Sequence, residues 1–140
     1  MRASLVERRM NSPVKELRVA VLVDDYGTAV RLYRDVLGLP VLQSWDEDHG
    51  SGVILDAGRA TLELLSRKQV ELVDRVEADG AESPPIRLAL EVDDSVDAAA
   101  RLEAAGAERL GGPVVTPWNH RNVRLKAPDG TQLTLFTVLE

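Results

Sequence analysis

The sequence predicts an α+β fold in which two βαβββ repeats form a cleft-bearing, partly open barrel of mixed β-sheet with helices outside. The main observation is a repeat: residues 18–25 read Arg-Val-Ala-Val-Leu-Val-Asp-Asp, and residues 87–94 read Arg-Leu-Ala-Leu-Glu-Val-Asp-Asp. Both copies alternate as a half-buried strand does, and both lead into a stretch with helical spacing. Turn signals then separate three further strand patterns in each half. Duplicated halves usually build a functional cleft between them, so candidate residues are sought on the strand faces that meet there.

The first half is predicted over residues 14–78, after a flexible tail at residues 1–13. An alternating strand at Val14–Val23 ends in two aspartates, which suit the entry of a helix. This helix ends at Gly38, a typical C-terminal cap, and Pro40 prevents it from resuming. Its apolar positions are Ala29, Val30, Tyr33, Val36 and Leu37. The later elements are a strand at Leu39–Trp45, a polar turn-rich segment at Asp46–Gly52, a hairpin of Val53–Asp56 and Ala60–Ser66, and a connecting helix at Arg67–Ala78.

The second half is predicted over residues 86–140, after a linker at residues 79–85, and the two halves are expected to form one structural domain. It repeats the plan of the first half, with Asp94 or Ser95 as the helix cap. Its last two strands are joined by Pro128-Asp129-Gly130, a strong turn signal. The predicted elements are a strand at Ile86–Val92, a helix at Val96–Ala105, and strands at Glu108–Val115, Asn122–Lys126 and Gln132–Val138.

Composition limits the classes of function. The chain has 140 residues, 44% of them hydrophobic and 29% charged, which is ordinary for a globular protein with a real core. Its formal net charge is −6 and no basic stripe stands out, so no nucleic-acid partner is expected. The absence of cysteine excludes disulfides and thiolate chemistry, and it fits a cytoplasmic location. No apolar run approaches the ~20 residues of a membrane span, so no membrane partner is expected.

Strand periodicity assigns one apolar face of each strand to the helices and the opposite face to the cleft. The helix-facing set is Val19, Val21, Val23, Leu62, Leu64, Leu88, Leu90, Val92, Leu133 and Leu135. The cleft-facing set includes Arg18, Glu63, Arg87, Glu91, Thr134 and Phe136. Four charged side chains are thus expected to point into a partly enclosed space, where an unpaired charge is costly.

The arrangement resembles the vicinal oxygen chelate superfamily, which includes glyoxalase I, extradiol dioxygenases, fosfomycin-resistance enzymes and bleomycin-resistance proteins. The resemblance covers about residues 15–138 and is carried by four segments. These are Tyr33-Arg-Asp-Val-Leu-Gly-Leu-Pro40, Thr61-Leu-Glu-Leu-Leu65, Leu90-Glu-Val-Asp-Asp94 and Ala127-Pro-Asp-Gly-Thr-Gln-Leu-Thr-Leu-Phe136. The similarity is greatest to the metal-free, bleomycin-resistance-like members, and it implies a homodimer.

The resemblance also implies where a metal ion would bind. Metal-using members place ligands, typically His and Glu, at positions that correspond to Arg18, Glu63, Arg87 and Thr134. Arginine cannot serve as a metal ligand, because its guanidinium stays protonated and offers no lone pair. We therefore expect no metal and no other cofactor. A rearranged metal site remains an alternative, with Glu16 brought near by a one-residue shift in register; the two histidines, His49 and His120, are predicted in loops.

Two interpretations of the cleft remain open. The charged side chains could pair with one another as a structural network. Alternatively, one arginine pairs with Glu63 while the other binds an acidic or carbonyl group of a ligand, to which its fork geometry is suited. Trp118 lies in a polar loop and could stack on a planar ligand, or pack against the neighbouring strand or a dimer partner. Trp45, His120 and Phe136 are further candidate ligand contacts, and His120 is a candidate general base only if it reaches a substrate.

The favoured hypothesis is that the protein binds a small organic molecule, of unknown identity, in a metal-free cleft, for antibiotic sequestration or natural-product handling. The alternative is a lyase, isomerase or dioxygenase of the same superfamily with an altered metal site or a metal-free acid–base mechanism. A purely structural dimerising module is disfavoured, because charged residues inside a cleft build a poor core.

Overall fold

The computed structural model describes residues 11–140. The first ten residues of the predicted tail lie outside the described part. The elements of the first half are β1 (Val14–Leu22), α2 (Tyr26–Val30), η1 (Arg31–Val36), β2 (Val41–Glu47), β3 (Gly50–Asp56) and β4 (Thr61–Leu65). Helix α3 (Arg67–Ala78) connects the halves. The elements of the second half are β5 (Ile86–Val92), α4 (Ser95–Ala104), β6 (Glu108–Val115), β7 (His120–Lys126) and β8 (Gln132–Val138).

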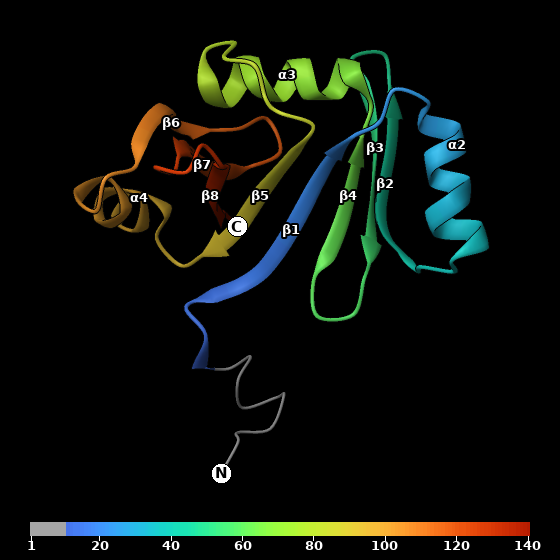
Figure 1. The fold of residues 1–140 in the computed structure, drawn as a ribbon, viewed down its shortest axis with the longest axis horizontal. Helices are drawn as coiled ribbons and strands as arrows, with labels where there is room; N and C mark the ends of the chain where they lie inside the picture. Colours follow the sequence, from blue (N-terminus) through green and yellow to red (C-terminus); the bar gives the residue numbers. More distant parts are fainter. Residues whose placement is uncertain (1–10) are drawn as a thin grey trace.

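The eight strands form one mixed sheet in the order β2-β3-β4-β1-β5-β8-β7-β6 (Figure 1). The first strands of the two repeats, β1 and β5, pair antiparallel at its centre, and each has the last strand of its own repeat as a parallel neighbour. The predicted α+β fold of two βαβββ repeats is therefore confirmed. The sheet is open, since β2 and β6 are its two edges and do not pair with each other.

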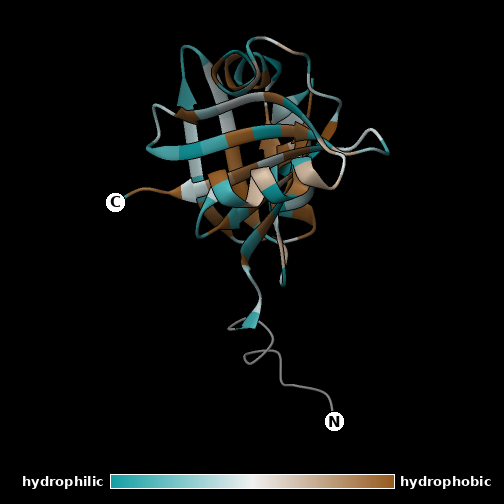
Figure 2. Cartoon of the chain, turned by 90° about the vertical axis from the view of Figure 1, so that its left-hand side faces the viewer, coloured by the Kyte–Doolittle hydropathy of each residue, from teal (hydrophilic) through white to brown (hydrophobic). Residues whose placement is uncertain are grey.

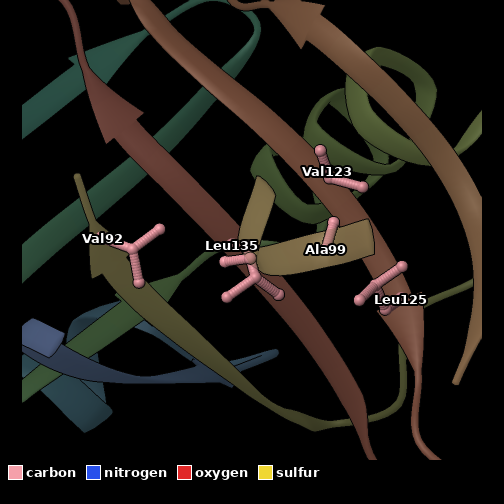
Figure 3. Packing of buried hydrophobic residues seen from close by; sticks show 6 residues of the cluster. Val92, Ala99, Val123, Leu125 and Leu135 are labelled. Carbon is pink, nitrogen blue, oxygen red and sulfur yellow. The ribbon is translucent and has the colours of Figure 1, made fainter. Parts of the chain in front are cut away.

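Each repeat has its own hydrophobic core between its half of the sheet and its own helix. In the first half, Val30 of the helical segment packs with Val53, Leu55 and Leu64. In the second half, Ala99 of α4 packs with β5, β7 and β8, and Figure 3 shows it against Val92, Val123, Leu125 and Leu135. Hydrophobic and hydrophilic residues alternate along the strands, as seen in Figure 2. The other face of the strands is therefore free for a site.

The helix entries confirm the two capping predictions. The Asp25 carboxylate accepts from the Thr28 backbone N–H, and the Asp94 carboxylate accepts from that of Asp97. Their neighbours do not cap. Instead, Asp24 forms an ion pair with Arg67 at 2.8 Å, and Asp93 forms one with Lys15.

The first helix differs from its predicted form. It starts as a short α-helix, α2, and continues with π-type hydrogen bonding in η1. This wider winding changes which residues share a face. Two of the five apolar positions at helical spacing, Val36 and Leu37, consequently do not share the buried face: they are 75% and 65% exposed.

The segment between the second and third strands is also different from the prediction. Residues 46–52, predicted as a polar turn-rich segment, belong mostly to β2 and β3, and only Asp48 and His49 form the turn between them. Gly52 lies opposite Trp45 in this hairpin. The sequence signal was misleading because β2 is a largely exposed edge strand, whose polar residues do not alternate as those of a half-buried strand do.

Helix α3 has the predicted bounds, but it takes a position that periodicity did not anticipate. It lies across one end of the sheet (Figure 1), and its residues Gln69, Val73 and Glu77 line the cleft instead of covering the outer face. Two glycines permit its close approach. A Cβ on Gly50 would collide with Gln69, and one on Gly111 would lie 2.0 Å from the Glu77 carbonyl oxygen. A capping Ser66 starts the helix, and Asp79 in the left-handed conformation ends it.

Candidate functional site

The cleft between the repeats contains a cavity of about 610 Å³, within the range of small-molecule sites. Its walls come from both halves of the sheet and from α3. Among the residues predicted from sequence, those that line it are Arg18, Trp45, Glu63, Arg87, Trp118, His120, Thr134 and Phe136. Glu91 is not among the lining residues. None of the helices in the described part of the chain is long and apolar enough to cross a membrane.

One side of the cavity is aromatic. His120, predicted in a loop, is instead the first residue of β7 and stacks on Phe136, with ring centroids 5.2 Å apart and an interplanar angle of 15°. The Arg18 guanidinium lies 5.0 Å from the centre of the Phe136 ring. Burial, together with the charge of Arg18, lowers the pKa of His120 below its ordinary value. Its neutral form is therefore favoured, and the imidazole presents a flat surface.

The two tryptophans lie at this cavity in different ways. Trp118 follows β6 in the turn before His120, and 36% of it is exposed, so one part of its ring is available to a ligand. Trp45 is held more firmly: its Nε1 donates to Gln69 Oε1 of α3 at 3.0 Å. A Cβ on Gly52 would lie 2.1 Å from the Trp45 ring, so this glycine allows the ring to lie on the β3 backbone.

Arg18 and Glu63 occupy the first-half positions of the predicted site. Arg18 Nε donates to Glu16 Oε2 at 2.9 Å, whereas its Nη1 is 3.8 Å from Glu63 Oε2. Thr61 also donates to Glu16 Oε2. Arg18 is therefore paired chiefly with Glu16, a residue that sequence reasoning considered only as the result of a register shift.

Burial raises the pKa of the Glu63 carboxyl above its ordinary value. Arg87 and Arg18 oppose this rise, and Glu77 and Glu16 add to it. The carboxyl, which lines the cavity, thus holds its proton more tightly than a free glutamate does.

The most buried polar cluster was not predicted. Arg124 of β7 is fully buried, and its Nη2 is 2.8 Å from Glu77 Oε2 while its Nη1 is 3.2 Å from Asp74 Oδ1. The Glu77 carboxylate also accepts from Asn122 Nδ2 and from Thr134 Oγ1. Although burial opposes ionisation of Glu77, Arg87 and Arg124 outweigh it and lower its pKa. The predicted helix at residues 67–78 shows which of its residues share a face. It does not show that this face meets the second half of the sheet.

Arg87 is 6% exposed and lines the cavity, yet it has no ion pair within 4.0 Å among residues 11–140. Its Nη1 donates to Thr134 Oγ1 at 2.8 Å. Within the described residues, the Arg87 side chain makes no other hydrogen bond. Glu63 and Glu77 stabilise it only through space. The predicted pairing network is therefore incomplete, and the unpaired guanidinium is the one in the second half.

The residues at the superfamily's metal positions do not fit a metal ion. Two of the four positions carry guanidinium groups, and Thr134 has its hydroxyl hydrogen directed to Glu77. Residues 11–140 contain no group of three or more His, Asp or Glu side chains placed to hold an ion. The absence of a metal ion from the cleft stays a prediction, and the side chains at these four positions support it.

The sequence matches the Glyoxalase/Bleomycin resistance protein/Dioxygenase superfamily model over residues 17–135. It is 28% identical over 130 residues to the uncharacterised protein YraH of Bacillus subtilis (strain 168), a match that covers 90% of this chain and all of YraH.

Solved structures share the fold. A hypothetical protein from Bacillus halodurans C-125 superposes with a TM-score of 0.66 at 17% identity, covering 88% of this chain and 93% of that one. Methylmalonyl-CoA epimerase from Mycobacterium tuberculosis gives a TM-score of 0.65 at 22% identity, covering 93% of this chain and 92% of that one. At such identities, the likeness establishes the fold alone.

Proposed function

The chain belongs to the Glyoxalase/Bleomycin resistance protein/Dioxygenase superfamily, and we propose that it binds a small planar organic molecule in its cleft without a metal ion. One observation carries the proposal: Arg87 is buried at the cavity wall with no ion pair among the described residues. The Arg87 N–H groups that Thr134 does not occupy are not among the fully buried atoms, so they face accessible space, and a ligand that supplies hydrogen-bond acceptors pairs with them there. The role is sequestration or handling of an antibiotic or another natural product.

The aromatic side of the cavity supports a planar ligand. The stacked rings of His120 and Phe136 form one surface, and Trp118 borders the opening. Each ring that a flat molecule covers contributes both apolar burial and a stacking preference of about 0.5–1.5 kcal/mol.

Equilibrium dialysis with a panel of planar bicyclic compounds tests this proposal. We expect the wild-type protein to bind at least one member of the panel, and Trp118→Ala to weaken that binding about tenfold. Val115→Ala is the matched control, since Val115 is exposed but does not line the cavity. Equal affinity of the Trp118→Ala variant contradicts the stacking role.

Elemental analysis of protein purified without chelators tests the absence of a metal. We expect no stoichiometric Ni, Zn, Mn or Fe. One ion per chain, lost in the Glu63→Ala variant, would overturn the metal-free cleft.

A second candidate is a metal-free isomerase or lyase, and Glu63 is the observation that favours it. This buried, cleft-facing carboxyl has a raised pKa, a property common in general acids and bases. The structural neighbours include methylmalonyl-CoA epimerase. Turnover of any substrate that is abolished by Glu63→Gln, with ligand affinity retained, would favour this enzyme over the binding protein.

The expected homodimer is part of the same proposal. Exposed apolar side chains are available for such an interface in η1, at its C-cap and in the edge strand β2, among them Leu32, Val36, Leu37, Val41 and Leu42. Light scattering coupled to size-exclusion chromatography gives the mass directly, and a monomer at micromolar concentration contradicts the dimer.

A further inference from the structure

Two arginines on the surface of this protein show how its guanidinium groups bind carboxylates. Arg34 donates from Nε to one oxygen of Asp35 at 2.8 Å and from Nη2 to the other at 3.2 Å. Arg67 binds Asp24 in the same way, again at 2.8 and 3.2 Å. This side-on geometry uses two parallel N–H groups, which match the two oxygens of a carboxylate. Nε and Nη2 are therefore the atoms to compare in the buried arginines.

Three arginines in or next to the cavity wall differ at these two atoms. Arg124 directs both toward Glu77, and Arg18 directs its Nε toward a glutamate of its own strand. Arg87 instead donates from Nη1, to Thr134 Oγ1 at 2.8 Å. Its Nε and Nη2 have no acceptor among residues 11–140, and they are not among the fully buried atoms that lack a partner. Because Arg87 lines the cavity, this side of its guanidinium faces accessible space there.

The guanidinium of Arg87 is held next to the aromatic side of the cavity. Its partner Thr134 lies on β8, and Phe136 is two residues further along the same strand. Residues two apart on a strand point to the same face and lie about 7 Å apart. Both of these side chains line the cavity, and His120 stacks on Phe136. A flat molecule that lies against this aromatic side can therefore carry a substituent to Arg87.

We propose that the planar ligand is an aromatic acid, whose carboxylate Arg87 binds side-on through Nε and Nη2. The inference rests on the proposed function, because it names the chemical class of the small planar molecule. It assigns Thr134 as a positioning residue. Its hydroxyl hydrogen is directed to Glu77, so its oxygen accepts from Arg87 Nη1 and holds the guanidinium with Nε and Nη2 left for a ligand.

The charges around Arg87 permit an anion. Glu77 has Arg124 as its contacting cation, at 2.8 Å. Glu63 lines the same cavity, and burial raises its pKa, which favours the uncharged form of this carboxyl group. A ligand carboxylate supplies two acceptor oxygens and a negative charge to Arg87. A carboxamide supplies one acceptor and directs N–H groups toward the guanidinium, so it is a poorer partner.

Calorimetric titration with 2-naphthoate and 2-naphthamide tests the inference on the wild-type protein at pH 7. The two probes have nearly the same shape, but only the acid carries a charge and two acceptor oxygens. We expect 2-naphthoate to bind about tenfold more tightly, because bidentate hydrogen bonds between charged groups are stronger than those to a neutral carbonyl. Equal binding of the two probes, or tighter binding of the amide, overturns the carboxylate assignment.

Two substitutions of Arg87 locate the effect. Arg87→Gln removes the cation, so we expect the preference for 2-naphthoate over the amide to disappear. Arg87→Lys keeps the charge but replaces the planar fork by a point charge, so we expect it to lose most of the preference as well. Arg121→Gln is the matched control, since Arg121 is exposed on β7 outside the cavity and its loss changes the net charge equally.

The variants also show how the contact could fail. A preference that survives in Arg87→Gln places the anion elsewhere, and a full preference in Arg87→Lys shows attraction to charge alone; either result contradicts side-on binding. A variant that has lost its fold binds neither probe, and in that event the wild-type ranking of the two probes decides.

The outcomes separate the inference from the proposed function. Failure of 2-naphthoate to bind, while the amide or other planar compounds do bind, overturns the aromatic-acid assignment and leaves a planar-ligand cleft in place. Failure of both probes and of the wider planar panel overturns both.

Discussion

Glu63 is a buried carboxyl group that faces two guanidinium groups but lies 3.8 Å from the nearer one, Arg18. Burial raises its pKa, so the folded protein binds this proton more tightly than the unfolded chain does. The stability that follows from this difference is complete below the pKa of this glutamate in the unfolded chain, near 4.5, and is lost as the pH rises through its pKa in the folded protein. Ionised Glu63 therefore makes the folded state less stable at neutral and alkaline pH.

The first prediction follows from the direction of this pKa shift. Glu63→Gln keeps the shape and removes the ionisable group, so we expect the variant to gain free energy of unfolding relative to wild type at pH 8, and to gain less at pH 4. Urea denaturation at the two pH values measures the difference. The exposed Glu108→Gln serves as control and should give the same difference at both. A Glu63→Gln variant less stable than wild type at pH 8 contradicts the assignment.

A second prediction at the residue scale concerns the contact between Gly52 and Trp45. A Cβ on Gly52 collides with the indole ring, so we expect Gly52→Ala to displace Trp45 and lower the free energy of unfolding by about 1–3 kcal/mol. Tryptophan fluorescence and urea denaturation measure the two effects. Gly27→Ala is the matched control, since nothing lies within 4 Å of its added Cβ. An unchanged emission spectrum in Gly52→Ala would show that the ring is not held there.

At the scale of elements, α3 is held to the second half of the sheet by ionic hydrogen bonds more than by apolar packing. Its buried residues include Gln69, Asp74 and Glu77, and the last two pair with the fully buried Arg124. Removal of one partner leaves the other charge buried and incompletely paired, which is far more costly than losing a surface pair.

We therefore expect Glu77→Gln to lower the free energy of unfolding by roughly 3 kcal/mol. Glu71→Gln on the exposed side of the same helix should stay within about 0.5 kcal/mol of wild type. Because Arg87 and Arg124 lower the pKa of Glu77, its stabilising effect is present above the unfolded pKa and is lost as the pH falls through the lower folded value. Urea denaturation at pH 7 and at pH 4 tests both statements, and equal effects of the two substitutions would contradict them.

Elements also show how far sequence patterns reach. The bounds of α3, β5 and β6 are those predicted. A clear period marks α3 and β5, whereas β6 was predicted as a strand broken by Gly111-Gly112-Pro113, and its register does shift there. The period-2 pattern also placed Arg18, Glu63, Arg87 and Thr134 on the cleft face, where the structure has them. The contribution of α3 could not be predicted in this way, since periodicity gives the face of a helix but not the partner that the face meets. For the same reason Arg124 and Asn122 were missed: their strand was recognised, but nothing local indicates that a buried carboxylate lies opposite.

At the scale of the whole molecule, the duplication explains why the site has two arginines and why they differ. Arg18 and Arg87 occupy equivalent places in the two βαβββ units, one on each of the central paired strands. Only the second repeat is covered at this point by the acidic face of α3, because a single connecting helix cannot lie symmetrically over both halves. Arg18 consequently pairs with Glu16 of its own strand, whereas Arg87 is left with Thr134 and the cavity.

The same symmetry gives a prediction for metal binding. Replacing both arginines by histidine adds two imidazoles to the cavity that the Glu63 carboxylate lines, and two imidazoles with one carboxylate are the donor set of many catalytic zinc sites. We expect the Arg18→His/Arg87→His variant to be stabilised by Zn²⁺, by about 2.7 kcal/mol at a concentration 100 times the dissociation constant. Thermal denaturation with and without Zn²⁺, followed by a chelator, measures this. The wild-type protein and each single variant should show little or no shift, because a half-site with two donors binds weakly and the remaining guanidinium repels the ion. A wild-type protein stabilised as strongly as the double variant would mean that its cleft already accepts a metal, and the guanidinium groups would then have to lie away from the ion.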